Sequence, residues 1–200
     1  MTESKPDQDK IAQLQEALAQ YAAGNINSDL FEEDLRQAAA PLHRKAINLL
    51  NSRRRSRWEL KQRLSEVEDA TPELIDWVLD QLEQSHLIDD AEFAAEWVRQ
   101  RHQYRQKSTA ILRRELAAKG IAEPLIIEAL DQVSPDDEWD NMTAVIDKKA
   151  RTLKTAPADR GEYEKALRKL VGVAVRRGYP SGEALSYSRQ VLDNLVEGSE

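Results

Sequence analysis

With 200 residues, 40% of them apolar, no cysteine and a net charge of −7, the chain can bury a hydrophobic core but cannot form a disulfide framework, a cysteine metal site or a cysteine nucleophile. The first ten residues contain no apolar signal-peptide segment, and no run approaches the ~20 apolar residues that span a bilayer. We therefore expect a folded cytoplasmic protein that makes no contact with a membrane.

Charged residues are segregated along the chain. Residues 1–41 hold eight acidic and three basic side chains, whereas the remainder is almost neutral, with 28 acidic and 26 basic residues. Within this remainder, residues 53–63 are basic, 66–83 are acidic, and 99–114 are basic with no acidic residue at all. Blocks of one sign create local fields that the net charge conceals.

The N-terminal residues 1–41 are expected to be an acidic extension. Ile11, Leu14, Leu18 and Tyr21 are spaced as on one face of a helix, but their surroundings are acidic and rich in glutamine. We therefore predict that the extension is partly helical or mobile, or that its helix docks on the first repeat.

The rest of the chain has helical spacing of apolar residues, interrupted by only seven glycines and seven prolines, so we predict an all-α protein. Ser56 and Glu59 form a Ser-x-x-Glu capping box, which predicts a helix start at Ser56. Thr71 followed by Pro72 predicts the next start. Further starts are predicted at Asp89 or Asp90, at Ser108 and near Pro124, and an end at Gly120.

The helical pattern repeats after 52 residues. A shift of that length superposes Ser56 on Ser108 and Leu60 on Leu112, together with Leu64 on Leu116, Pro72 on Pro124, Ile75 on Ile127 and Val78 on Leu130. A helix that ends in arginine precedes each copy, so each repeat has three helices. A fainter third copy begins at Ser134-Pro135, has a second helix before Gly178, and continues through a third that contains Leu185 and Leu195.

These repeats predict an elongated array of three tandem three-helix repeats, because a short helical unit buries its apolar face partly against its neighbour. We assign residues 42–88 to repeat 1, 89–133 to repeat 2 and 134–196 to a divergent repeat 3.

Catalytic chemistry has little support. His43, His86 and His102 have no metal-ligand spacing, and neither a Gly-rich phosphate loop nor a Gly-x-Ser-x-Gly motif is present. The acidic pairs Asp89-Asp90 and Asp136-Asp137 are better explained as helix caps and favourable helix N-terminal charges than as an acid and a base. We predict no catalytic residue, no metal site and no cofactor, and an enzyme is the least favoured class.

The basic segments of the first two repeats are the candidate interaction sites, since they lie at a similar place in each, around the junction of the first and second helices. Trp58 is predicted to lie off the leucine stripe of its helix. Three interpretations stay open: a face paired with nearby acids, a surface for phosphates on which Trp58 stacks on a base, and a surface for an acidic protein. The candidate contact residues are Arg53, Arg54, Arg55, Arg57, Trp58, Lys61, Arg63, Arg99, Arg101, Arg105, Lys107, Arg113 and Arg114.

Three motifs in order resemble the RecX family, whose members regulate the bacterial recombinase RecA. They are "RRSRWELKQRL" at 54–64, "LIDDAEFAAEWVRQR" at 87–101 and "LRRELAAKGI" at 112–121. The resemblance covers about residues 42–133 well and 134–196 loosely, and residues 1–41 lie outside it.

The resemblance implies an all-helical protein of three three-helix repeats and a non-enzymatic function in DNA repair, recombination and the SOS response. Such a protein binds RecA and its filament on single-stranded DNA, within the groove of the filament. It restrains ATP hydrolysis, strand exchange and the co-protease activity of RecA towards LexA. We expect a monomer that contacts the filament and, in addition, single- or double-stranded DNA.

Two other classes remain as alternatives. Basic three-helix units resemble helix-turn-helix modules, so an autonomous DNA-binding helical repeat protein is the runner-up; it predicts DNA binding without RecA and a steep loss of affinity with salt. An unrelated helical adaptor is third.

Overall fold

The computed structural model describes residues 29–153 and 155–198, and every regular element in those ranges is a helix. The chain divides into two units, Met1–Asp89 and Asp90–Glu200, which are considered separately below. The prediction of an all-α protein is confirmed. The helix predicted around Ile11 to Tyr21 lies outside the described residues.

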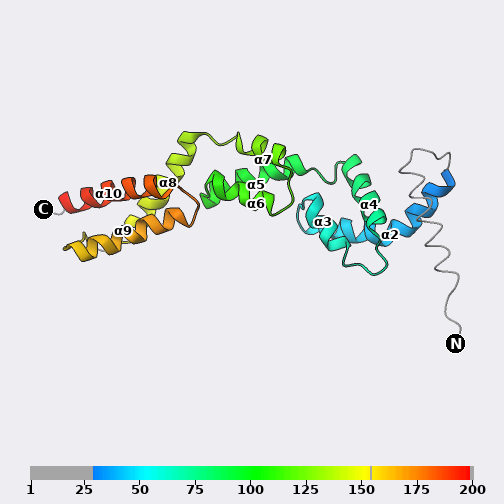
Figure 1. Cartoon of the computed structure of the whole chain (residues 1–200), viewed down its shortest axis with the longest axis horizontal. Helices are drawn as coiled ribbons and strands as arrows, with labels where there is room; N and C mark the ends of the chain where they lie inside the picture. Colours follow the sequence, from blue (N-terminus) through cyan, green and yellow to red (C-terminus); the bar gives the residue numbers. More distant parts are fainter. Residues whose placement is uncertain (1–28, 154, 199–200) are drawn as a thin grey trace, which may run out of the picture. The chain divides into compact units, whose positions relative to one another are not determined.

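The first unit contains α2 (Asp29–Ser52), α3 (Arg57–Leu64) and α4 (Pro72–Gln84), drawn from blue to green in Figure 1. These three helices enclose one hydrophobic core. The largest fully buried side chains in it are Leu35, Leu60, Leu64, Leu79 and Leu82. The leucine stripe predicted for the helix after Ser56 is thus its buried face.

Helix α2 extends across the boundary that the sequence analysis places after residue 41. It begins at Asp29 and continues through Pro41, and Leu35 and Ala39 are each only 1% exposed within the core of the first unit. Proline lacks the amide hydrogen that an interior helical residue donates, so on local chemistry it favours a helix start. Packing of the apolar residues on both sides of Pro41 keeps the helix continuous.

The second unit contains two groups of three helices. The first group is α5 (Asp90–Arg105), α6 (Thr109–Ala117) and α7 (Glu123–Leu130); the second is α8 (Pro135–Ala150), α9 (Arg160–Val175) and α10 (Ser181–Glu197), which run from green to red in Figure 1. Each group has its own hydrophobic core. The first core is centred on Leu112, Leu116 and Ile126, and the second on Met142, Ile146, Leu170 and Leu192.

Helix N-caps occur where the sequence predicts them. The hydroxyl oxygen of Ser108 accepts a hydrogen bond from the amide of Ile111, and the side chain of Thr71 accepts one from Leu74. Ser134 forms a capping box with Asp137. Each cap satisfies an amide that has no partner within its helix.

Polar contacts around Gly178 join the two helix groups of the second unit. The amide of Ser108 donates to the carbonyl of Arg177 at 2.9 Å, and the phenol of Tyr179 donates to the carbonyl of Gln106 at 2.9 Å. Gly178 lies between these bonds with a φ of +88°. Burial raises the pKa of the Tyr179 phenol, aided by the charge of Glu138, so this donor keeps its proton.

Candidate interaction surface

Helix α3 carries the first candidate segment on a capped, amphipathic helix. The hydroxyl oxygen of Ser56 accepts a hydrogen bond from the amide of Glu59, and the Glu59 carboxylate accepts one from the amide of Ser56. Leu60 and Leu64 are buried, whereas Trp58 is 46% exposed. The fold therefore uses the leucines of the motif and leaves much of the indole of Trp58 in contact with solvent.

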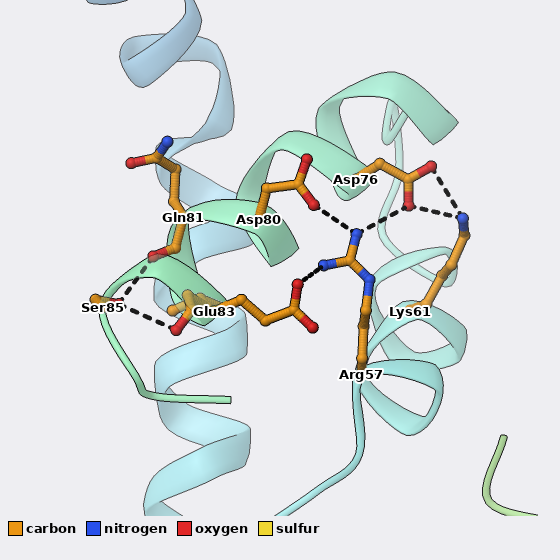
Figure 2. Close-up of polar contacts among 8 residues, drawn as sticks. Arg57, Lys61, Asp76, Asp80, Gln81, Glu83 and Ser85 are labelled. Carbon is orange, nitrogen blue, oxygen red and sulfur yellow. Dashed lines mark hydrogen bonds and ion pairs between the residues drawn. The ribbon is translucent and has the colours of Figure 1, made fainter. Parts of the chain in front are cut away.

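Arg57 and Lys61 form an ion-pair network with the acidic face of α4 (Figure 2). Arg57 donates at 2.7 Å to Asp80 and at 2.7 Å to Glu83, and Lys61 donates at 2.7 Å to Asp76. Asp76 lies between the two cations, 4.0 Å from Arg57 Nη2. Partial burial disfavours the charge of Arg57, but the hydrogen bond to Asp80 and the carboxylates outweigh it and raise the pKa of the guanidinium.

This network favours one of the roles left open for Arg57 and Lys61. Two cations face three carboxylates, so the local charge is negative and does not favour phosphate. The geometry supports the first of the three open interpretations, in which the basic face is paired with nearby acids and holds α3 against α4.

Replacing Arg57 with glutamine should lower the free energy of unfolding by about 1–2 kcal/mol, because it breaks two charge-assisted hydrogen bonds between α3 and α4. Urea denaturation followed by circular dichroism measures this change. Arg63→Gln is the matched control: Arg63 pairs at 3.2 Å with Glu66, both are more than half exposed, and its loss should cost at most about 0.5 kcal/mol. Equal effects of the two variants would contradict a structural role for Arg57.

The arginines before α3 brace the connection from α2. Arg53 forms two hydrogen bonds with the Glu59 carboxylate, at 3.0 and 3.1 Å, and the Arg55 guanidinium donates to the carbonyl of Leu49 at 3.1 Å. Partial burial and the charge of Arg53 lower the pKa of Arg55. Arg54 is exposed. At least two of the three consecutive arginines thus stabilise the chain itself.

The second basic segment centres on the carboxylate of Glu115. This group accepts a hydrogen bond from the indole of Trp97 at 3.0 Å, lies 3.3 Å from Arg101 and pairs with Lys107. The Arg101 guanidinium also stacks over the Trp97 ring, 3.1 Å from its centroid. Lys119 lies 4.2 Å from the same centroid. Arg101 and Lys107 therefore belong to a partly buried cluster.

Three of the four remaining candidates of this segment also have partners within the chain. Arg99 pairs with Glu96 at 2.7 Å, and Arg113 pairs with Glu123. Arg114 donates to the carbonyl of Ala110 at 3.3 Å, and Arg105 is exposed. At the position that Lys61 and Arg113 share, each cation thus pairs with an acid of the following helix. The positive charge at this position is therefore present in both repeats and is neutralised by an ion pair in each.

A further basic region was not predicted from the sequence. Residues 148–177 contain ten Lys or Arg and only three Asp or Glu, and they include all of α9. The outward side of α9 and its C-cap residue Arg176 carry four exposed cations, none of which forms an ion pair with an acid of the described ranges. We call Lys165, Arg168, Lys169 and Arg176 the cationic face of α9. A charge count over residues 148–177 is the signal that identifies this region, which lies outside the motifs at 54–64, 87–101 and 112–121.

The other polar groups considered from the sequence have structural roles. His102 is only 7% exposed; its ring contacts the carbonyl of Lys107 and the side-chain amide of Asn141. Hydrogen bonds from Ser134 lower the pKa of Asp137, which caps α8. Among the side chains of residues 35–153 and 155–198, no group of three or more His, Asp or Glu could hold a metal ion. The helices of the same ranges include none long and apolar enough to cross a membrane.

Comparisons with known proteins match this architecture. A family model described as RecX, second three-helix domain, matches residues 89–130, the span of α5 to α7. The regulatory protein RecX of Corynebacterium efficiens is 42% identical over 191 residues, covering 94% of this chain and 90% of its own length. That of Streptomyces coelicolor is 34% identical over 155 residues, covering 77% and 79%.

Solved structures of the same family share the fold. The crystal structure of RecX from Lactobacillus salivarius matches with a TM-score of 0.62 at 21% identity, over 78% of this chain and 96% of that chain. A second crystal structure of a regulatory protein RecX matches with a TM-score of 0.64 at 23% identity, over 90% and 87%. At these identities the structural matches establish the helical fold alone.

Proposed function

Because the chain belongs to the RecX family of regulatory proteins, we propose that it binds RecA and the RecA filament on single-stranded DNA and restrains the activities of RecA. These are ATP hydrolysis, strand exchange and the co-protease activity, in DNA repair, recombination and the SOS response. The observation that carries the proposal is the 42% identity over 94% of the chain with a regulatory protein RecX. The protein acts by binding, without catalysis of its own, as a cytoplasmic monomer.

Trp58 is the residue of the first motif best suited to anchor RecA. Its side chain is 46% exposed, while the neighbouring cations Arg57 and Lys61 are neutralised by α4. Tryptophan is enriched among the few residues that dominate binding energy at protein interfaces. The rigid capped helix α3 also fixes its position, which lowers the entropy cost of binding.

The test is the ATPase activity of RecA on single-stranded DNA, with the full chain added at equimolar and lower amounts. We expect ATP turnover to fall. Trp58→Ala should raise the concentration needed for half-inhibition by about 30-fold, since truncating a dominant interface residue costs about 2 kcal/mol or more. Trp139→Ala is the matched control, because Trp139 is 45% exposed but lies on α8, outside the motif.

The possible outcomes distinguish the proposed inhibition of RecA from the proposed role of Trp58 as its contact. If the unaltered chain leaves RecA turnover unchanged at equimolar amounts, the proposed function is wrong. If the two tryptophan variants inhibit equally well, RecA is bound at another surface and Trp58 is an ordinary exposed residue.

The alternative, an autonomous DNA-binding protein, loses most of its original basis. It rested on the basic segments 53–63 and 99–114, whose cations now largely pair with Asp76, Asp80, Glu83 and Glu115. Charge that is already neutralised releases few counterions from a phosphate backbone.

A further inference from the structure

The four cations of the cationic face of α9 differ from most of those in the motif segments because none of them forms an ion pair with an acid of the described ranges. The acids of α9 lie near its N-terminus and are engaged there: the Glu162 carboxylate accepts a hydrogen bond from the amide of Ala158, and Glu164 pairs with Arg160 at 3.0 Å. Beyond Glu164 the helix contains no acidic residue. The last three turns of α9 thus present positive charge without compensation from their own helix.

The cationic face of α9 is a single surface. With about 100° between successive residues, its four members fall within an arc of roughly 100°, opposite the buried side of the helix. The buried side is formed by Ala166, Leu170 and Ala174. All four cations are exposed, and none pairs with an acid contributed by α8 or α10.

Gly172 brings Arg176 towards the other three cations. A Cβ atom at Gly172 would lie 3.2 Å from Arg176 Nη1, so the guanidinium lies beside the glycine one turn before its own position. Gly172 also lies in the middle of the arc and is partly exposed. The eleven steps along the helix from Lys165 to Arg176 rise by about 16 Å, a distance along which one strand of DNA presents roughly five phosphates.

We propose that the cationic face of α9 binds the phosphate backbone of a nucleic acid. Protein interfaces are centred on buried aromatic or large apolar anchors, and this arc has none: between its cations lie Gly172 and the edge residue Val175, which is 43% exposed. Uncompensated Lys and Arg side chains on a rigid helix are what a phosphate backbone requires, and they read no base sequence. The contact is therefore independent of sequence and sensitive to salt.

This inference goes beyond the proposed function, because it assigns direct DNA binding to one surface of the chain, which lies outside the motif segments and does not need RecA. It rests on the proposed function only for its biological context, in which the chain binds a RecA filament that also contains DNA. The two are tested with different reagents.

The experiment measures binding of the full chain, without RecA, to a fluorescent oligothymidylate of about 30 nucleotides, longer than the site of a single binding module. We expect Arg168→Gln/Lys169→Gln to weaken binding by about tenfold or more at roughly 50 mM salt. The slope of log affinity against log salt should become shallower by about 1.4, because two contacts are lost at ~0.7 each on a single strand. A duplex of the same length, tested in parallel, shows whether the backbone is bound in both forms.

The matched control is Arg44→Gln/Lys45→Gln, an adjacent and exposed Arg-Lys pair on α2 that has the same change in charge. We expect less than a twofold effect from it. Circular dichroism of both variants checks that helicity is retained.

Three results would overturn the proposal. The first is that the unaltered chain does not bind the oligonucleotide at low salt. The second is that the two double variants lose equal DNA affinity. The third is that the α9 variant binds DNA normally but loses affinity for RecA in the absence of DNA. The last result would make the face a protein contact. A chain that inhibits RecA but binds no DNA by itself would overturn this proposal and leave the proposed function intact.

Discussion

Gly178→Ala should lower the free energy of unfolding of the second unit by about 3 kcal/mol or more. Gly178 has a φ of +88°, which costs an L-residue about 1–2 kcal/mol. A Cβ atom there would lie 2.4 Å from Ser108 Oγ and 2.5 Å from Ile111 Cγ1, so α6 and its cap must also move. Thermal denaturation followed by circular dichroism should show the melting temperature lowered by about 10 °C or more.

The same substitution should weaken the connection between the two helix groups of the second unit. The bonds on either side of Gly178, from Ser108 to Arg177 and from Tyr179 to Gln106, require the close approach that the added methyl group prevents. Limited proteolysis should therefore cut near residues 106–109 faster in the variant. Gly182→Ala is the control: nothing lies within 4 Å of its Cβ position near the start of α10, and it should gain up to about 1 kcal/mol. An unchanged melting temperature for Gly178→Ala would contradict the close packing at this glycine.

Features that depend on neighbours in the sequence were predicted well. The caps at Ser56, Thr71, Ser108 and Ser134 are all present, because each bond joins residues three positions apart. The exposed position of Trp58 follows from the same local geometry, since helical spacing places it away from the buried leucines. Short-range chemistry was therefore sufficient for the helices and for the amphipathic faces that build the repeat array.

Features that depend on residues far apart in the sequence could not be predicted from local chemistry. Arg57 pairs with Asp80 and Glu83, 23 and 26 residues away, and the sequence leaves open whether such a cation faces an acid or solvent. The acidic extension was predicted to end at residue 41, whereas α2 begins at Asp29, because the packing that holds Leu35 in the core is tertiary. For the candidate site, the sequence identified which residues are charged, and the fold determines which of those charges remain uncompensated.

Glu115→Gln should lower the free energy of unfolding by about 2–3 kcal/mol, the cost of a lost charged partner in a partly buried cluster. The carboxylate neutralises Arg101 and Lys107, whose side chains are 23% and 27% exposed, and accepts the Trp97 indole hydrogen. Burial lowers the pKa of Arg101, and the charge of Glu115 opposes this shift. The glutamine variant would therefore leave the partly buried guanidinium of Arg101 and the ammonium of Lys107 without a counter-charge. Urea denaturation measures the loss.

Glu123→Gln is the control for an ordinary surface ion pair. Glu123 pairs with Arg113, and both side chains are about half exposed. Removing this pair should lower the free energy of unfolding by less than about 1 kcal/mol. Adding Lys107→Met to Glu115→Gln should restore part of the stability, since it removes one of the two uncompensated charges. If Glu115→Gln is as stable as the unaltered chain, Arg101 and Lys107 do not depend on this carboxylate and are again candidates for contact with a partner. If the loss and its partial rescue are both observed, Arg101, Lys107 and Glu115 serve the fold, and the proposed contacts with RecA or DNA must come from exposed groups such as Trp58 and the cationic face of α9.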